Sequence, residues 1–268
     1  MPAAAEVIAA LERAYPPELA ESWDAVGLVC GDPAEPVTKV LFCVDPVEET
    51  VDEAIELGAE LIVAHHPLLL RGVTGVATDT AKGRLVHRMV RAGITLFCAH
   101  TNADSASPGV SDALARAIGL TALRPLSPNA DGVTGIGRIG ELAEPEPFAR
   151  FVERVGAALP KTRPGVFGGG DPERPIRTVA VSGGSGDSYL KQATAAGVDA
   201  YVTADLRHHP AGEHLGSGGV VPALVGVTHW ASEWPWCGQA SDVVHAALPG
   251  TVDIHVSTRC TDPWNIRV

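Results

Sequence analysis

Histidine and carboxylate side chains gather in a few short segments of this sequence, where they could bind metal ions or transfer protons. The six residues are His65, His66, His100, Asp104, His229 and Glu233. Imidazole nitrogens and carboxylate oxygens together suit zinc, iron or manganese. A carboxylate can bridge two metal ions through its two oxygens, which a neutral imidazole cannot do. Two groups that each combine histidine with a carboxylate therefore favour a dinuclear metal site.

The spacing of these residues is compatible with that chemistry but does not require it. His100 and Asp104 are four residues apart, so that on a helix they lie about one turn apart on the same side. An adjacent pair such as His65-His66 is more often a surface or strand-end feature than a pair of ligands. The clustering of such residues at the ends of predicted strands, in both halves of the chain, favours ligation.

Short β-branched runs alternate with alanine-rich helical stretches, which is typical of an α/β protein. The predicted strands span 37–45, 61–64, 94–99, 177–182 and 199–203. The predicted helices span 48–57, 81–91, 111–118 and 188–196. Ligands of open α/β sheets bind beyond the carboxyl ends of the strands. His65 and His66 directly follow one predicted strand and His100 follows another, so these side chains are placed where a site is expected.

The chain is predicted to form two related α/β units that face each other, with a dinuclear metal cleft between them. TKVLFCVD…ELGAELIVAHHP in the first half resembles RTVAVSGG…AAGVDAYVTADLRHHP in the second. Turn residues at 124–135 favour a boundary there, so that 1–126 is the first unit and 127–268 the second. Residues 160–175 are predicted to be a long loop. The sequence leaves open whether the C-terminal segment packs back on the first unit.

Composition excludes several classes of function. The formal charge of −12 argues against nonspecific binding of nucleic acid or of an anionic membrane surface, because both depend on Lys and Arg. The five cysteines are widely spaced without a C-x-x-C motif, which argues against a disulfide framework or a thiolate zinc site. No apolar run is long enough for a membrane span, and the first ten residues do not resemble a signal peptide. We therefore expect a cytoplasmic protein.

Ordered motifs along nearly the whole chain resemble the family of dinuclear-metal proteins known as GTP cyclohydrolase 1 type 2 homologues, or NGG-interacting-factor-like proteins. The motifs are WDAVGLVCGD (23–32), AHHPLLLRGV (64–73), AHTNADSASPGVSDALARAIGL (99–120), GIGRIGEL (135–142), SGGSGDS (182–188), TADLRHH (203–209), HWASE (229–233) and STRCTDPW (257–264). Ala25 and Ala204 depart from the asparagine and glycine that are usual at these positions, as does the GVT that precedes His229. No proposed ligand is affected, although substrate contacts are put in doubt.

The resemblance implies two divalent metal ions per chain, either zinc, iron or manganese, and a toroidal homohexamer. The implied ligands are His65, His66, Asp104, His229 and Glu233. His100 lies at the other histidine of its motif and is the candidate for catalysis as general acid and base. The chain has no room for the domain that longer relatives insert between the halves.

The function that this resemblance implies is a metal-dependent hydrolase with a small-molecule substrate, such as a nucleotide, and the family name points to opening of the GTP ring. Two alternatives use the same ligands. One is a metal-binding or regulatory oligomer without turnover, and the other is a hydrolase of phosphoesters or cyclic amides.

Other motifs carry less weight. Gly135-x-Gly137-x-x-Gly140 has the letters of a dinucleotide fingerprint, but the prolines that follow favour a strand with turns over the required helix. The glycines of SGGSG (182–186) could cradle an anion, although a plain tight turn is favoured. His208 and His209 could orient metal ligands or lie on the surface. The tryptophans around HWASE could line a pocket for a planar base or serve packing and interfaces.

Overall fold

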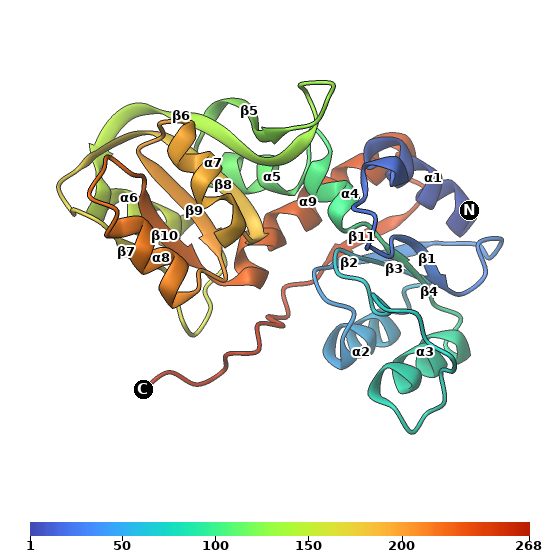
Figure 1. Cartoon of the computed structure of the whole chain (residues 1–268). Helices are drawn as coiled ribbons and strands as arrows, with labels where there is room; N and C mark the ends of the chain where they lie inside the picture. Colours follow the sequence, from blue (N-terminus) through green and yellow to red (C-terminus); the bar gives the residue numbers. More distant parts are fainter. The chain divides into compact units, whose positions relative to one another are not determined.

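The computed structural model describes all 268 residues of the chain, which form two compact units (Figure 1). Unit 1 comprises Met1–Ala106 and Cys237–Thr261, and unit 2 comprises Ser107–Trp236 and Asp262–Val268. Each unit has one β-sheet with helices packed against it, so the fold is mixed α/β, as the alternation of strand and helix patterns predicts. None of the helices combines the length and the apolar character needed to cross a lipid bilayer.

Unit 1 is built on a five-stranded sheet with the strand order β1-β4-β3-β2-β11. Its strands are β1 (Gly27–Cys30), β2 (Lys39–Cys43), β3 (Leu61–Ala64), β4 (Thr95–Cys98) and β11 (Asp253–Val256). Its helical segments are α1 (Ala4–Ala14), η1 (Pro17–Leu19), α2 (Glu48–Leu57), α3 (Ala81–Arg91) and α4 (Thr101–Ser105). Strands β4, β3, β2 and β11 are parallel, and only the edge strand β1 is antiparallel. The carboxyl ends of four neighbouring strands therefore meet at one edge of the sheet.

Helices cover both faces of this sheet, which explains why its central strands are mostly apolar. Leu41, Ile62 and Leu96 form one core cluster with Val51 of α2 and Met89 of α3. Figure 1 shows α2 and α3 on one face of the sheet and α1 on the other. Helix α2 ends at Gly58, whose left-handed conformation (φ 66°) is one that glycine adopts without strain. The side chain of Thr80 caps α3 by accepting a hydrogen bond from the backbone N–H of Gly83.

Unit 2 is built on a six-stranded sheet with the strand order β5-β6-β8-β9-β10-β7. Its strands are β5 (Thr121–Pro128), β6 (Gly135–Pro147), β7 (Phe167–Gly169), β8 (Pro175–Ser185), β9 (Ala200–Ala204) and β10 (Ala223–Val227). Its helical segments are α5 (Val110–Ala117), α6 (Phe148–Ala158), η2 (Asp187–Tyr189), α7 (Leu190–Ala195) and α8 (His208–Leu215). Helix α9 (His229–Ala247) begins in unit 2, and its residues from Cys237 onward belong to unit 1. Strands β8, β9 and β10 are parallel, so their carboxyl ends also share one edge.

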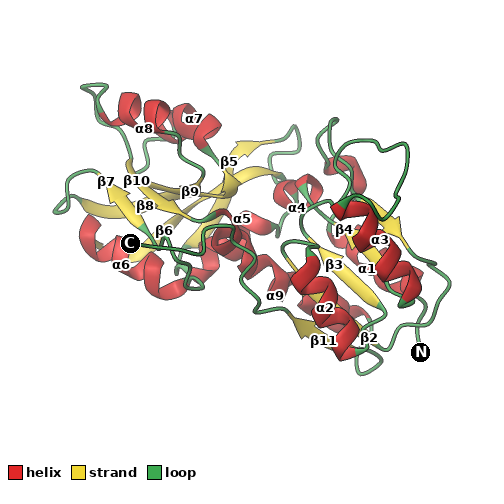
Figure 2. Ribbon diagram, turned by 90° about the horizontal axis from the view of Figure 1, so that it is seen from below, coloured by secondary structure: helices red, strands yellow, loops and turns green.

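Two core clusters hold the sheet of unit 2, one on each face. Phe151 and Val155 of α6 pack with Val179 and Val202 on one face, and Leu190 of α7 packs in a separate cluster on the other. Figure 2 shows α6 on one side of this sheet and α7 and α8 on the other. The parallel strands are thus buried on both faces, so the ends of the strands are where polar side chains can gather into a site.

Most predicted elements are present with similar bounds. The structure has helices at Glu48–Leu57 and Ala81–Arg91 and a strand at Leu61–Ala64, as predicted, and the segment with the dinucleotide letters lies in strand β6 as expected. Two predicted irregular segments are wrong in part. Residues 124–135 were expected to be turns, but they contain most of β5 and the start of β6, which form an antiparallel pair. The predicted loop at 160–175 contains β7, which pairs with β10.

Candidate metal centre

In unit 1 the carboxyl ends of three adjacent parallel strands carry the polar residues of the site. His65 and His66 directly follow β3, and His100 follows β4 with only Ala99 between them. Asp45 lies two residues after β2. The parallel register of β2, β3 and β4 sets the ends of these strands beside one another, so residues that are distant in sequence lie at one edge of the sheet.

Each of the three imidazoles is held through its Nδ1 atom. The Nδ1 atom of His65 lies 2.9 Å from the backbone oxygen of Ala99. The Nδ1 atom of His66 lies 2.7 Å from Oδ1 of Asp45, and that of His100 lies 2.9 Å from Oδ1 of Asp24. Carbonyl and carboxylate oxygens accept hydrogen bonds, so Nδ1 carries the proton in each ring. The neutral rings then present a lone pair on Nε2, which is the atom that can bind a metal.

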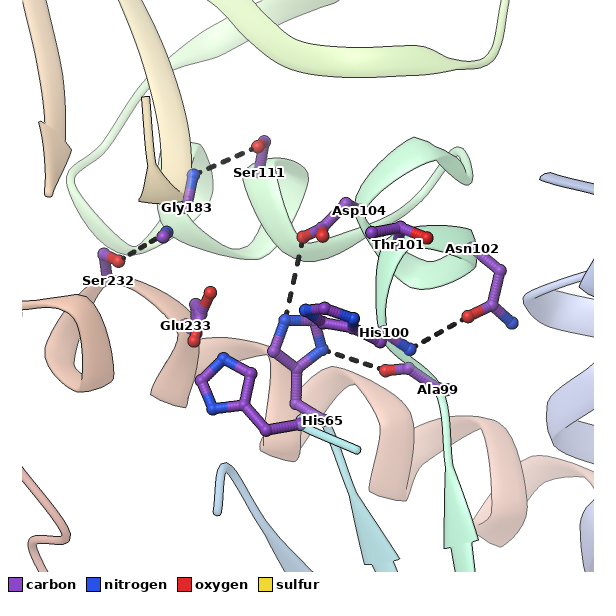
Figure 3. Close-up of polar contacts among 12 residues, drawn as sticks. His65, Ala99, His100, Thr101, Asn102, Asp104, Ser111, Gly183, Ser232 and Glu233 are labelled. Carbon is purple, nitrogen blue, oxygen red and sulfur yellow. Dashed lines mark hydrogen bonds and ion pairs between the residues drawn. The ribbon is translucent and has the colours of Figure 1, made fainter. Parts of the chain in front are cut away.

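These rings are close to one another and to a carboxylate. A nitrogen from each of His65, His66 and His100 lies within 4.8 Å of those of the other two, which is compatible with a shared metal ion. Oδ1 of Asp104, on α4, lies 3.7 Å from Nε2 of His65 (Figure 3). The side chain of His65 is fully buried, whereas that of Asp104 is 20% exposed. Unit 1 thus gathers three imidazoles and one carboxylate, a donor set suited to zinc, iron or manganese.

The carboxylates behind His66 and His100 are themselves fixed by threonines. Oδ2 of Asp24 accepts hydrogen bonds from the backbone N–H and the hydroxyl of Thr101. Oδ2 of Asp45 accepts one from the hydroxyl of Thr261, which follows β11. Burial alone would raise the pKa of Asp24, but the hydrogen bonds from His100 and Thr101 outweigh burial and hold that pKa below its ordinary value. Asp24 is therefore ionised at neutral pH and is a strong acceptor for the His100 N–H.

In unit 2 His229, the first residue of α9, pairs with Glu233 about one turn further along the helix. Nε2 of His229 lies 3.0 Å from Oε1 of Glu233, and the carboxylate is only 3% exposed. Nδ1 of His229 lies 2.7 Å from Oδ2 of Asp205, which directly follows β9. The hydroxyl of Ser232 accepts a hydrogen bond of 2.8 Å from the backbone N–H of Gly184 at the end of β8 (Figure 3). The ends of β8, β9 and β10 therefore surround this pair just as strand ends surround the histidines of unit 1.

The donor atoms of this pair fit a metal ion. If Nδ1 of His229 donates to Asp205, the neutral ring has a lone pair on Nε2, and that lone pair faces Oε1 of Glu233. Two acceptor atoms 3.0 Å apart repel unless a proton or a cation lies near both. With bonds of about 2.1 Å, two ligands of one zinc ion stand about 3.0–3.4 Å apart. The cradle is also tight, because a Cβ on Gly184 would lie 2.4 Å from Oε1 of Glu233.

All six residues singled out in the sequence lie at strand ends or within the first five residues of the helix that follows, four in unit 1 and two in unit 2. His208 and His209 do not join them. They begin α8, are exposed, and contact each other with ring centroids 5.3 Å apart. Trp230 and Trp236 are buried, which is typical of a packing role.

Sequence reasoning missed the three aspartates that hold the imidazoles, Asp24, Asp45 and Asp205. Asp45 and Asp205 closely follow parallel strands, as the histidines do, and this position is the one signal that could have found them. Asp24 lies before β1 and is 76 residues from its partner His100, so no local spacing points to it.

The family model described as Duf34/NIF3 (NGG1p interacting factor 3) matches residues 2–263. This chain belongs to the Duf34/NIF3 family. The resemblance seen in the ordered motifs is therefore confirmed over nearly the whole length of the chain.

Relatives and solved structures agree with that assignment. A Streptomyces coelicolor protein named GTP cyclohydrolase 1 type 2 homolog is 52% identical over 274 residues, which cover 100% of this chain and 95% of the relative. A Mycobacterium tuberculosis protein of the same name is 40% identical over 369 aligned residues, covering 98% of this chain and 96% of the relative. That alignment is longer than the 268 residues of this chain, so the relative contains inserted residues.

The fold is shared with proteins of known structure. A Bacillus cereus protein related to NIF3 is 27% identical with a TM-score of 0.90, over 100% of this chain and 99% of that one. A Staphylococcus aureus protein is 26% identical with a TM-score of 0.88, over 99% of both chains.

Proposed function

We propose that this Duf34/NIF3 protein binds two divalent metal ions per chain and uses them to hydrolyse a small molecule, with GTP or a related nucleotide as the first candidate substrate. The observation that carries the proposal is that four histidines at strand ends are each held through Nδ1, which leaves Nε2 as the ligand atom. The name of the relatives at 52% and 40% identity supports the choice of GTP.

The proposed ligands are His65, His66 and Asp104 of unit 1 and His229 and Glu233 of unit 2. Zinc, iron and manganese all suit this mixture of imidazole and carboxylate. When bound, the two metals lower the pKa of a water molecule and polarise the substrate. The two carboxylates would offset part of the charge of the metals, and the metals would supply positive charge for an anionic nucleotide in this acidic protein.

His100 is proposed to transfer protons during the reaction. The ionised Asp24 holds the Nδ1 proton of His100, which leaves Nε2 able to accept a proton and later to return it. The side chain of His100 is 15% exposed, so a substrate can reach it, while that of Asp24 is fully buried. This arrangement orients the imidazole, as a buried aspartate does for a catalytic histidine.

Elemental analysis of the chain, purified without affinity histidines, tests metal binding first. We expect close to two transition-metal ions per chain, and a large loss of metal in Asp104→Ala and in Glu233→Ala. Asp52→Ala is the matched control, because Asp52 pairs with Arg88 away from the site and should keep the metal content of the wild type. Metal content near zero that dialysis against zinc, manganese or iron does not restore would refute the proposal.

Turnover is tested by following formate release and the ultraviolet absorbance of GTP, with a chelator-treated sample as control. His100→Gln should keep both metals and lose activity. Loss of metal in this variant would instead make His100 a ligand.

Two other results would change the proposed reaction without changing the metal site. Two bound metals with no turnover on GTP, phosphodiesters or cyclic amides would favour a metal-binding or regulatory oligomer. Chelator-sensitive activity on phosphodiesters or cyclic amides, but not on GTP, would favour the other class of hydrolase. We also propose a homohexamer, which light scattering coupled to size-exclusion chromatography measures directly.

A further inference from the structure

Asp205 has a backbone conformation that only one other non-glycine residue of this chain adopts. Its φ angle is 54°, in the left-handed region, and the other such residue is Ala122 with φ 53°. Side chains with a Cβ are strained in this region, although aspartate and asparagine tolerate it better than other residues. Backbone strain of this kind persists where the surrounding structure or a function requires it.

The strained conformation directs the carboxylate of Asp205 to His229. Thr203 and Ala204 at the end of β9 pair in register with Gly226 and Val227 at the end of β10. The chain therefore leaves the sheet at neighbouring points, with Asp205 directly after β9 and the start of α9 shortly after β10. Oδ2 of Asp205 reaches to 2.7 Å from Nδ1 of His229 although the aspartate side chain is 52% exposed.

The contact determines what the opposite side of the ring can do. When a metal ion lies between Nε2 and Oε1 of Glu233, which are 3.0 Å apart, the ring keeps its one proton on Nδ1, where Asp205 accepts it. A carboxylate behind an imidazole also makes the ring a stronger electron donor and fixes its orientation. The same arrangement recurs at His66 with Asp45 and at His100 with Asp24, but only Asp205 adopts a strained backbone in making it.

We propose that Asp205 is a positioning residue that selects the Nδ1–H tautomer of His229 and aims Nε2 at the metal that Glu233 also binds. This inference rests on the proposed metal function. Removing such a partner from a metal-ligating histidine weakens metal binding by about 10–100-fold. A role in the turn alone predicts a different result, because relieving the strain would then improve stability without affecting the metal.

The variants Asp205→Ala, Asp205→Gly and Asp205→Asn separate the two roles, with zinc as the probe and a competing chelator to measure affinity. Ala and Gly should both weaken zinc binding by about 10–100-fold. Glycine also relieves the strain, so Asp205→Gly should unfold at a higher temperature than Asp205→Ala when both are free of metal. Asparagine tolerates the left-handed conformation and keeps an oxygen acceptor, so Asp205→Asn should recover much of the lost affinity. Ala122→Gly relieves the same strain elsewhere in unit 2 and should bind zinc as the wild type does.

A spectroscopic measurement on the zinc-bound protein provides the second readout. Nitrogen-15 NMR of the imidazoles distinguishes a ring that binds zinc through Nε2 and keeps its proton on Nδ1 from a ring that binds zinc through Nδ1. His229 should be in the Nδ1–H form in the wild type and in Asp205→Asn, and in a mixture of forms in Asp205→Ala.

The outcomes separate failure of this inference from failure of the proposed function. Wild-type affinity for zinc in Asp205→Ala, or an unchanged tautomer of His229 in that variant, would overturn the positioning role alone. A wild-type protein that binds no zinc, iron or manganese would refute the metal function, and the positioning role with it.

Discussion

A methyl group added at Gly184 should displace Glu233 and weaken metal binding. Gly184 lies at the end of β8 with φ 65°, and a Cβ there would lie 2.4 Å from Oε1 of Glu233 and 3.1 Å from Nε2 of His229. The backbone of Gly184 has little freedom to move away, because its N–H donates to Ser232 and its oxygen accepts from Thr203. The carboxylate of Glu233 must therefore move by about 1 Å to reach an ordinary contact distance. Metal ligands tolerate displacements of only about 0.2 Å.

Two quantities in Gly184→Ala should therefore change. The left-handed conformation alone costs an alanine about 1–2 kcal/mol, which should appear as a lower free energy of unfolding of the metal-free protein. The displaced carboxylate should weaken zinc binding by at least about tenfold. This is the lower end of the loss of affinity that follows when a metal-bound histidine loses its hydrogen-bond partner. Tenfold corresponds to about 1.4 kcal/mol of binding free energy. Competition with a chelator measures the affinity, and denaturant titration measures the stability.

Gly197→Ala is the matched control for this experiment. Gly197 has nearly the same φ angle, 66°, but a Cβ there would contact nothing within 4 Å. Gly197→Ala should therefore lose about the same stability as Gly184→Ala and bind zinc as the wild type does. Equal zinc affinity in the two variants would refute the argument that the close approach of Gly184 shapes the site.

Two further predictions concern stability, and a third concerns zinc binding. Burial alone would raise the pKa of Asp199, but hydrogen bonds from the backbone N–H groups of Arg177 and Thr178 hold that pKa below the ordinary 3.8. The contribution of Asp199 to stability is therefore present above about pH 4 and is lost as the pH falls through the lowered pKa. Asp199→Asn should flatten that part of the pH dependence of the free energy of unfolding, which denaturant titration measures. The side chain of Arg138 is 1% exposed and lies 2.8 Å from the carboxylate of Asp112. Arg138→Ala should lower the free energy of unfolding by about 3–5 kcal/mol, because the buried carboxylate loses its partner. A loss below about 1 kcal/mol in denaturant titration would contradict this prediction. Thr261→Val removes the hydroxyl that donates to Asp45 and should weaken zinc binding. Thr261→Ser keeps the hydroxyl and is the matched control.

The sequence predicted that the candidate residues follow strands because strand ends leave a clear signal. A β-branched run that stops at histidine, as Leu61–Ala64 does before His65, indicates both the strand and the edge of the sheet at which the histidine lies. Helix ends were equally clear where a residue such as Gly58 follows a periodic stretch. Both signals are local, since they depend on residues within a few positions of one another.

The hydrogen-bond partners of the histidines could not be predicted because they depend on contacts between distant segments. Asp24 and His100 are separated by 76 residues, and the left-handed conformation of Asp205 has no signature in the residues around it. The tight approach of Gly184 to Glu233 is likewise a property of the folded chain. The glycines of SGGSG were therefore interpreted as a tight turn, whereas in the structure they end strand β8 beside the first turn of α9.

The pairing of β11 with β2 has a consequence for the order in which the chain folds. Residues Ser107–Trp236 provide nearly all of unit 2 in one continuous stretch, whereas the sheet of unit 1 includes β11, which is synthesised after that stretch. The hydroxyl that fixes Asp45 comes from Thr261, 216 residues later. Closing so long a loop is slow compared with forming local contacts, and domains generally fold as units during synthesis. On the ribosome, unit 2 can therefore fold first, and the histidines of unit 1 receive their full set of supporting contacts only when translation has passed residue 261.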